Sequence, residues 1–318
     1  MTQQRIDCDY CVLLVSLSFY DYALATIMKL STSLNIFWDV GVELERAIER
    51  CAEAGFEALD LNLSDFRRMD DPPFLGPQGE EWAEGIRDKA ASVGLTFTQM
   101  HGPQFPKFVE GEVTERMTAM SHDSLRIAGV MGIPWVVWEP DVTAGDYEEE
   151  HRKEVFRMNY EFFEPLVETA EKYDTGVCLE NVPDSMGKSR DCPKWVCSHA
   201  VELCELVDVF QSQRVGVCWD TGHAHMQGLK QGKELHILGE RLRMLHIQDN
   251  NGQADQHLLP FMGTIDWRDI MDALYDIHYA GDFTYEVHNA VRHLPDSLKD
   301  SMLRYSVALG KALIERNF

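Results

Sequence analysis

The chain has 318 residues, of which 45% are hydrophobic, and a formal net charge of −24 at pH 7. This length and apolar content suit one large domain with a buried core. The negative charge excludes nucleic acid as an expected partner, because proteins that neutralise phosphates concentrate Lys and Arg. No run approaches the roughly 20 apolar residues of a membrane span, so no membrane partner is expected.

Residues 1–27 precede the first predicted strand and have no clear role in a fold. Residues 11–20 are apolar, but they follow two aspartates and lack the basic start and the cleavage site of an export signal. We therefore expect one domain over residues 28–318. The first 27 residues are interpreted as an N-terminal extension outside the native fold, or as a misplaced start.

Cysteine usage indicates reduced thiols and a cytoplasmic protein. The 8 cysteines are scattered, and the Cys-x-x-Cys pair formed by Cys8 and Cys11 has no second pair to complete a metal site. Cys178 and Cys218 fall inside predicted strands, where a free cysteine usually behaves as a small core residue.

Short β-branched or aromatic runs alternate with longer amphipathic stretches, which is the pattern of repeated βα units around a parallel sheet. The runs predict strands at residues 31–37, 56–61, 95–100, 134–138, 176–180, 215–219, 243–247 and 283–287. Helices are expected at residues 42–54, 80–93, 113–131, 148–173, 200–210, 267–278 and 297–315.

Turn-forming glycines stand at several predicted joints between a helix and the next strand: Gly55, Gly94, Gly132 and Gly281. No Gly-x-Gly-x-x-Gly motif follows the first strand, which argues against a dinucleotide-binding open sheet. Repeated βα units over a span of this size predict an α/β protein with a single closed (β/α)8 TIM barrel.

The fifth to eighth predicted strands each end in a residue type that commonly binds metal ions. We call these residues the tetrad: Glu180, Asp220, His246 and Glu286. Period-two geometry places them on the same strand faces as small or slender residues that can fill a barrel: Cys178, Cys218, Met244 and Thr284. Active sites of such barrels form where the strands end, so the tetrad is expected to point together into the mouth.

Three carboxylates crowded at one mouth repel each other strongly unless a cation neutralises them. The tetrad therefore predicts one divalent metal, and its mixture of oxygen and imidazole ligands suits Mn, Zn, Co or Fe. The alternative is that each acid pairs with an Arg or Lys across the barrel. Three acids and one imidazole in matching strand-end positions argue against that alternative.

Four motifs surround the tetrad in chain order: Leu-Glu-Asn (179–181), Trp-Asp-Thr-Gly-His (219–223), Leu-His-Ile-Gln-Asp-Asn (245–250) and Tyr-Glu-Val-His (285–288). Together they resemble the signature of the xylose-isomerase-like barrel superfamily, and the match covers nearly the whole chain from Met28. This superfamily includes sugar and sugar-phosphate isomerases and epimerases, inosose dehydratases and isomerases, and endonuclease IV. The resemblance implies that the tetrad holds one shared metal, and that Glu180 and Glu286 also move protons.

A second set of polar residues follows the sixth and seventh predicted strands. We call it the trio: His223, Asp255 and His257. The trio resembles the third-metal ligands of the endonuclease branch, which leaves a second metal open. We favour substrate binding, because polar groups at a mouth commonly orient small ligands without holding ions.

Three further strand ends bear on the site. His101 closes the third strand, resembles a polar position of the family and is expected to bind substrate. Glu139, after the fourth strand, stands where the endonuclease branch commonly carries histidine, which argues against a full three-zinc phosphodiesterase site. Asp60, in the second strand, either faces the pocket or serves in a helix cap or salt bridge.

The tetrad and the resemblance together imply an enzyme that isomerises or epimerises a small sugar or sugar phosphate. A divalent metal would stabilise an enediolate while Glu180 and Glu286 move the protons. Three alternatives stay open: a dehydratase of an inosose-type substrate, an endonuclease IV-like phosphodiesterase, and a sugar-binding barrel without turnover. The resemblance also leaves a homo-oligomer open.

Overall fold

The computed structural model describes residues 28–37, 43–66, 69–104, 112–142, 149–183 and 196–318. The predicted extension, residues 1–27, lies outside the described residues, so its exclusion from the fold stays a prediction. Over the described ranges, none of the helices combines the length and apolar character needed to cross a membrane. The cysteines in these ranges are free: Cys51, Cys178, Cys197, Cys204 and Cys218.

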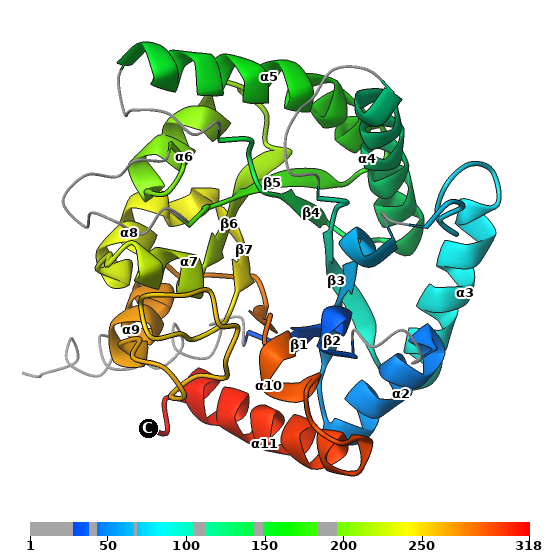
Figure 1. Ribbon diagram of the computed structural model, residues 1–318, viewed down its shortest axis with the longest axis vertical. Helices are drawn as coiled ribbons and strands as arrows, with labels where there is room; N and C mark the ends of the chain where they lie inside the picture. Colours follow the sequence, from blue (N-terminus) through cyan, green and yellow to red (C-terminus); the bar gives the residue numbers. More distant parts are fainter. Residues whose placement is uncertain (1–27, 38–42, 67–68, 105–111, 143–148, 184–195) are drawn as a thin grey trace, which may run out of the picture.

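Eight parallel strands form a barrel (Figure 1), which confirms the predicted (β/α)8 class. They are β1 (Leu30–Ser33), β2 (Ala58–Asn62), β3 (Thr96–His101), β4 (Trp135–Trp138), β5 (Gly176–Glu180), β6 (Val215–Asp220), β7 (Leu242–His246) and β8 (Phe283–Tyr285). Their order is β7-β6-β5-β4-β3-β2-β1-β8. Ile247 links β7 to β8: its N–H donates to Thr284 O at 2.8 Å, and its carbonyl accepts from Glu286 N at 3.0 Å. These two bonds close the ring.

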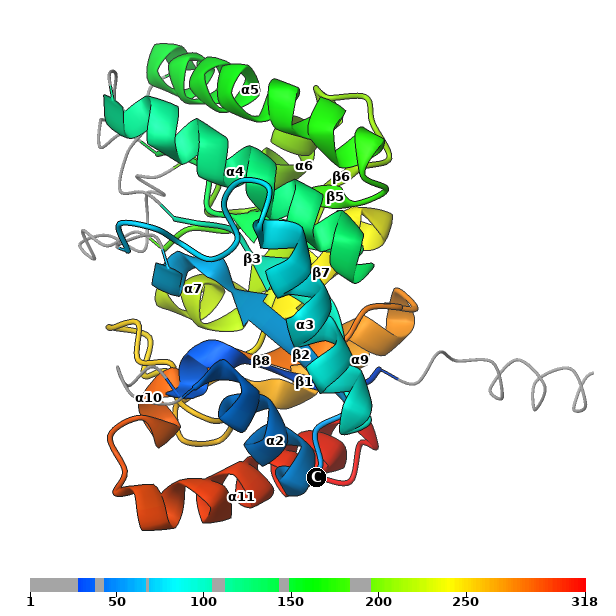
Figure 2. The ribbon, with the colours of Figure 1, turned by 90° about the vertical axis from the view of Figure 1, so that its right-hand side faces the viewer.

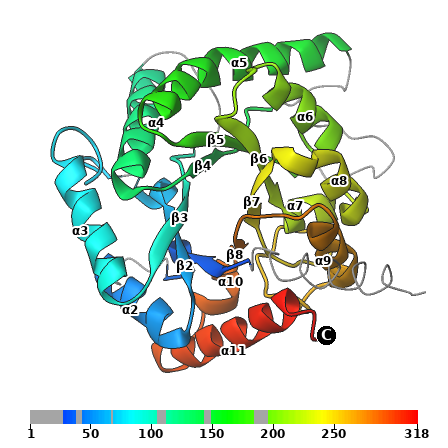
Figure 3. The same cartoon turned by 180° about the vertical axis from the view of Figure 1, so that it is seen from behind.

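Helices surround the barrel on its outside, as the front and back views show (Figure 1 and Figure 3). They are α2 (Leu44–Ala54), α3 (Gly79–Ser92), α4 (Glu112–Met131), α5 (Glu149–Lys172), α6 (Ala200–Asp208), α8 (Gln231–Leu238), α9 (Trp267–Asp276) and α11 (Asp296–Ile314). In α2, Ala47, Ile48 and Cys51 recur at helical spacing and are buried. Such apolar stripes pack against the outer face of the strands to form the main core.

Two short helices mark the end of the barrel at which the strands finish. α7 (Thr221–Met226) follows β6 and α10 (His288–Val291) follows β8. Figure 2 shows both helices toward the same end of the molecule. The sequence pattern predicts none of α7, α8 and α10, because each is too short to show a clear apolar periodicity.

The first and last strands are shorter than predicted. The strand expected at residues 31–37 ends at Ser33, and Leu34–Phe37 form a 3-10 helix, η2, with all its residues buried. β8 ends at Tyr285, so Glu286 lies just beyond the strand. As a result, the polar side chains of Asn35 and Glu286 both lie just beyond the regular strands.

Three of the four predicted joint glycines adopt positive φ as expected: Gly55 (100°), Gly94 (82°) and Gly132 (72°). Gly281 does not, and the left-handed residue after α9 is His278 (φ 53°). Gly281 has a different role, because a Cβ there would lie 2.2 Å from the Tyr279 hydroxyl.

The barrel interior is apolar on one side and polar on the other. A separate apolar cluster joins β4 to β7: Val137, Cys178, Cys218 and Met244. On the other side, register aligns Asp60 with Ser33 of β1 and with Gln99 of β3. The Thr284 hydroxyl donates to Gln99 Oε1 at 2.9 Å, which extends this polar side to β8.

Candidate metal centre

The tetrad stands at the ends of four consecutive strands. Glu180, Asp220 and His246 are the last residues of β5, β6 and β7, and Glu286 directly follows β8. All four side chains are buried, and one ligand atom from each lies within 4.8 Å of the others. The structure thus brings together the residues that the strand-end pattern selects.

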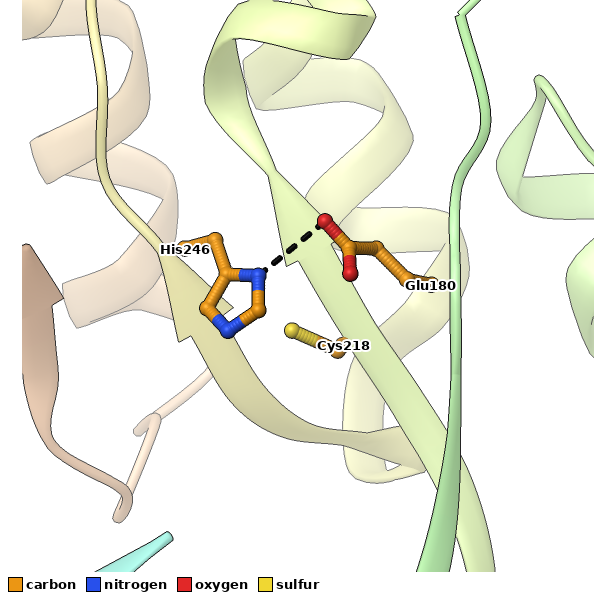
Figure 4. Close-up of side chains that lie close together, drawn as sticks. All are labelled: Glu180, Cys218 and His246. Atoms are coloured by element: carbon orange, nitrogen blue, oxygen red, sulfur yellow. Dashed lines mark hydrogen bonds and ion pairs between the residues drawn. The ribbon is translucent and has the colours of Figure 1, made fainter. Parts of the chain in front are cut away.

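The imidazole of His246 faces two of the carboxylates. Its Nδ1 lies 3.0 Å from Glu180 Oε1 and 3.6 Å from Glu286 Oε2. Figure 4 shows the Glu180 contact and the Cys218 thiol beside the same ring. Two carboxylate oxygens around one ring nitrogen call for a hydrogen-bond donor or a cation at that point, which is either a proton on Nδ1 or a metal ion.

Asp220 is held in place by its neighbours. It is the N-cap of α7, and its Oδ1 accepts from His223 N at 2.7 Å. The Asn181 side chain accepts from Asp220 N at 2.6 Å and donates to Asp220 O at 2.9 Å, which locks the end of β5 to the end of β6. Asn181 therefore serves to position the tetrad.

Burial and crowding shift the pKa values of the tetrad. Burial raises the pKa of Asp220 to about 7, and the surrounding carboxylates add to this effect. Burial also opposes ionisation of Glu180, but the surrounding imidazoles, His246 first, lower its pKa to about 2. For His246, burial lowers the pKa, yet Cys218 and the two glutamates raise it well above the ordinary value.

This donor set fits a divalent cation. In the described part of the chain, the ion pairs of the three tetrad carboxylates are all with histidines, so the alternative of Arg or Lys partners does not hold there. Glu180 Oε2 is buried without a hydrogen-bond partner. Carboxylate oxygens with one imidazole nitrogen form a set that Mn, Zn, Co or Fe accepts.

The trio lies beside the tetrad at the same mouth. His257 Nε2 is 2.8 Å from Asp255 Oδ2, and His223 Nε2 is 3.6 Å from the same oxygen. The other nitrogen of each ring donates to a backbone carbonyl: His223 Nδ1 to Asn181 O at 2.9 Å, and His257 Nδ1 to Glu286 O at 2.9 Å. Metal-ligating imidazoles are commonly held in this way, so the trio is able to hold a second cation.

Without a cation, the trio is an ion-paired cluster. Burial lowers the pKa of His257, but its hydrogen bond to Asp255 and the Glu286 charge raise it to about 9. Burial raises the pKa of Asp255, but hydrogen bonds from His223 and His257 lower it overall. The same atoms therefore serve either as charged hydrogen-bond partners or as metal ligands.

A cavity of about 220 Å³ is lined by two tetrad residues, Glu180 and Glu286, and by the whole trio. Its lining residues are Asn35, Asn62, Ser64, Asp65, His101, Gln104, Glu139, Glu180, His223, Asp255, His257, Glu286 and His288. Among the described residues that line it, none is Lys or Arg. The volume is below the roughly 300–1,000 Å³ of sites for drug-sized ligands, which suits a small polar ligand.

His101 lies in the cavity and against the tetrad. Its ring stacks on that of His246, with centroids 5.6 Å apart, and its Nε2 is 3.9 Å from Glu180 Oε2. Its Nδ1 donates to Gly102 O at 2.9 Å. Glu139 also lines the cavity, where burial and the charge on Glu180 raise its pKa.

Sequence reasoning missed several cavity residues. Asn35 Nδ2 lies 3.3 Å from Glu286 Oε1 and donates to it. Asn35 lies in η2, where the strand period of two does not apply, so the sequence pattern provided no signal for it. Asp60 serves in neither a cap nor a salt bridge, because it is fully buried and neither carboxylate oxygen has a hydrogen-bond partner. It is also not among the described residues that line the cavity.

The (β/α)8 barrel, together with the three carboxylates and one histidine at its mouth, indicates the class of protein to which the chain belongs. The protein-family model for the xylose isomerase-like TIM barrel matches residues 48–305. The chain belongs to this family, as the four motifs predict.

The curated proteins that are similar to the chain include three that match more than two thirds of it. It is 25% identical to the MJ1311 protein of Methanocaldococcus jannaschii, over 82% of this chain and 84% of that protein. It is 23% identical to D-psicose 3-epimerase of Enterocloster bolteae, over 75% of each. It is 26% identical to a probable endonuclease 4 of Methanoculleus marisnigri, over 68% of this chain and 76% of that protein.

Solved structures share the fold. A D-tagatose 3-epimerase-like protein is 20% identical, with a TM-score of 0.69 over 91% of this chain and 99% of that chain. The IOLI protein, solved with a zinc atom, is 17% identical, with a TM-score of 0.69 over 92% of this chain and 99% of that chain. At such identities, the likeness establishes the barrel alone.

Proposed function

We propose that this protein is a divalent-metal-dependent epimerase or isomerase of a free sugar. The observation that carries the proposal is the convergence of the tetrad, whose ligand atoms lie within 4.8 Å of one another. The similarity to a D-psicose 3-epimerase and to a zinc-containing barrel of the same fold supports it. The cytoplasmic location and a homo-oligomeric state stay predictions.

A divalent cation at the tetrad would polarise a sugar carbonyl and stabilise the negative charge that develops when the neighbouring carbon loses its proton. Glu180 and Glu286 come from different strands and both line the cavity. One of them removes the proton, and the same or the other one returns it. Return to the opposite face of the same carbon is epimerisation, whereas return to the adjacent carbon is isomerisation.

The charges of the cavity favour a sugar without phosphate. Asp65, Glu139 and Asp255 line it, and none of its described lining residues is Lys or Arg. The trio histidines are already paired with Asp255. A phosphate dianion would therefore meet these carboxylates with no Lys or Arg among the described lining residues to offset them, which Coulomb repulsion disfavours at low dielectric. Hydroxyl groups would instead bond to the imidazoles and amides.

Phosphodiester hydrolysis is the second candidate, because the trio geometry suits a further metal ion and a probable endonuclease 4 is among the relatives. Two observations count against it. The net charge of −24 repels nucleic acid. Glu139 stands where the resemblance calls for histidine, and its carboxylate adds negative charge to the cavity.

The test is proton exchange with solvent. Protein loaded with Mn or Zn is incubated in deuterated water with a panel of ketoses and inososes, and with abasic-site DNA. We expect deuterium next to a sugar carbonyl without loss of water. Loss of water from an inosose would indicate a dehydratase, DNA cleavage a phosphodiesterase, and tight sugar binding without exchange a barrel that lacks turnover.

A further inference from the structure

One carboxylate inside the barrel has no part in the proposed chemistry. Asp60 lies on β2, is 0% exposed, and neither of its oxygens has a hydrogen-bond partner. Register pairs it with Gln99, two residues before His101, so it lies one layer deeper than the cavity wall. A buried carboxylate is costly unless a donor or a positive charge compensates it.

The groups that offset the negative charge of Asp60 belong to the candidate metal centre. Burial raises its pKa, and the opposing influences are first the imidazole of His246 and then that of His101. His101 already donates from Nδ1 to Gly102 O, and its Nε2 faces Glu180. Of these two imidazoles, His246 is therefore the one with a ring nitrogen that has no hydrogen-bond partner.

That nitrogen is Nε2. His246 presents Nδ1 to Glu180 and Glu286, while Nε2 is buried without a hydrogen-bond partner. An imidazole that ligates a metal through Nδ1 carries its proton on Nε2. Metal-ligating histidines almost always donate this proton to a carboxylate, a carbonyl or a water, which orients the ring.

We propose that Asp60 accepts the Nε2–H of His246 through one buried water and thereby holds Nδ1 toward the metal. Asp60 is then a positioning residue, and the inference rests on the proposed function, because it requires a metal at the tetrad. Ser31 Oγ and Ser33 Oγ are also buried without partners. A water needs two to four polar partners, and this side of the interior supplies them.

The competing acceptor is the Cys218 thiol, which lies beside the His246 ring (Figure 4). Burial raises the pKa of this thiol to about 12, so it stays neutral. A neutral thiol is a weak acceptor compared with a carboxylate. Asp60 is therefore favoured over Cys218 as the acceptor of the His246 Nε2 proton.

The experiment compares the wild type with Asp60→Asn, Cys218→Ala and Ser121→Ala, the last as a matched control that removes another buried, unpartnered polar group, on α4 and outside the proposed water site. Zinc affinity is measured by competition with a chelator, and the His246 Nε2 proton of the zinc-loaded protein is observed by long-range nitrogen–proton NMR. We expect Asp60→Asn to weaken zinc binding by about 10–100-fold and to shift the Nε2 proton and speed its exchange. Ser121→Ala should leave both unchanged.

Each outcome bears on a distinct claim. Wild-type affinity and an unshifted Nε2 proton in Asp60→Asn overturn the inference, as does a change produced by Cys218→Ala alone. A wild type that binds no zinc contradicts the proposed function and this inference with it. If Asp60→Asn does not fold, a crystal structure of the zinc-loaded wild type decides, because any acceptor on Nε2 other than a water bonded to Asp60 overturns the inference.

Discussion

The Nδ1 atom of His246 lies 3.0 Å from Glu180 Oε1, although 66 residues separate the two in the chain. Burial would lower the pKa of this imidazole, but Cys218, Glu180 and Glu286 raise it well above its ordinary value. These neighbours therefore favour the protonated form of His246 in the metal-free protein. Its Nδ1 proton occupies the position at which the proposed metal binds.

Metal binding should release protons and strengthen as the pH rises. His246, with its raised pKa, must lose a proton before Nδ1 can ligate, and Asp220, with a pKa of about 7, must ionise. Titration calorimetry in buffers of different ionisation enthalpy measures the number of protons released. Zinc or manganese affinity that is constant from pH 6 to 8, with no proton release, would be incompatible with these assignments.

Glu286→Gln should abolish turnover while the fold survives. The substitution removes a metal ligand and a proton-transfer group, and loss of a positioned general base alone costs about 10²–10⁴-fold in rate. Solvent deuterium exchange measures the loss, and circular dichroism checks the fold. Glu168→Gln, on the exposed face of α5, is the matched control and should keep full activity. An active Glu286→Gln variant would refute the role of Glu286.

The metal-free protein should lose stability as the pH rises through the titration of His257. Its pKa is raised from 6.5 to about 9, so its stabilising contribution is complete below about 6.5 and disappears as the pH approaches about 9. The contribution is at most about 3 kcal/mol. Thermal unfolding at several pH values in the presence of chelator measures it. His257→Gln should flatten the profile between these limits, whereas the exposed His236→Gln should not.

Phosphorylated sugars should be poor substrates compared with the free sugars. The cavity offers carboxylates at Asp65, Glu139 and Asp255, and none of its described lining residues is Lys or Arg. Repulsion of a dianion should appear mainly in KM, and Glu139→Gln should narrow the difference. Equal or better kcat/KM for a sugar phosphate would contradict the proposed preference for a free sugar.

The strand positions and the tetrad were predictable from the sequence because both depend on local rules. Strand runs repeat with helices between them, and residues two apart share a strand face. Glu180 and Cys178 illustrate the second rule, since Cys178 packs in the interior cluster and Glu180 is the last residue of the same strand. The carboxyl ends of parallel strands meet at one mouth, so the convergence of the four tetrad side chains follows from the pattern.

The remaining residues depend on contacts across the barrel. Asn35 donates to Glu286, 251 residues away, and lies in a 3-10 helix where a strand was predicted. The proposed role of Asp60 depends on its position relative to the His246 imidazole, to which no local sequence pattern connects it. The trio could be selected from the sequence, but the carbonyl bonds of His223 and His257, which allow it to hold a cation, emerge only from the structure.

The central claim is that the tetrad binds one divalent metal ion. A crystal structure of the protein loaded with manganese or zinc, with anomalous data at the metal edge, tests it most directly. The account predicts a single strong peak within about 2.0–2.3 Å of Glu180, Asp220, His246 Nδ1 and Glu286. No peak among these side chains, at a metal concentration that saturates the protein, would contradict it.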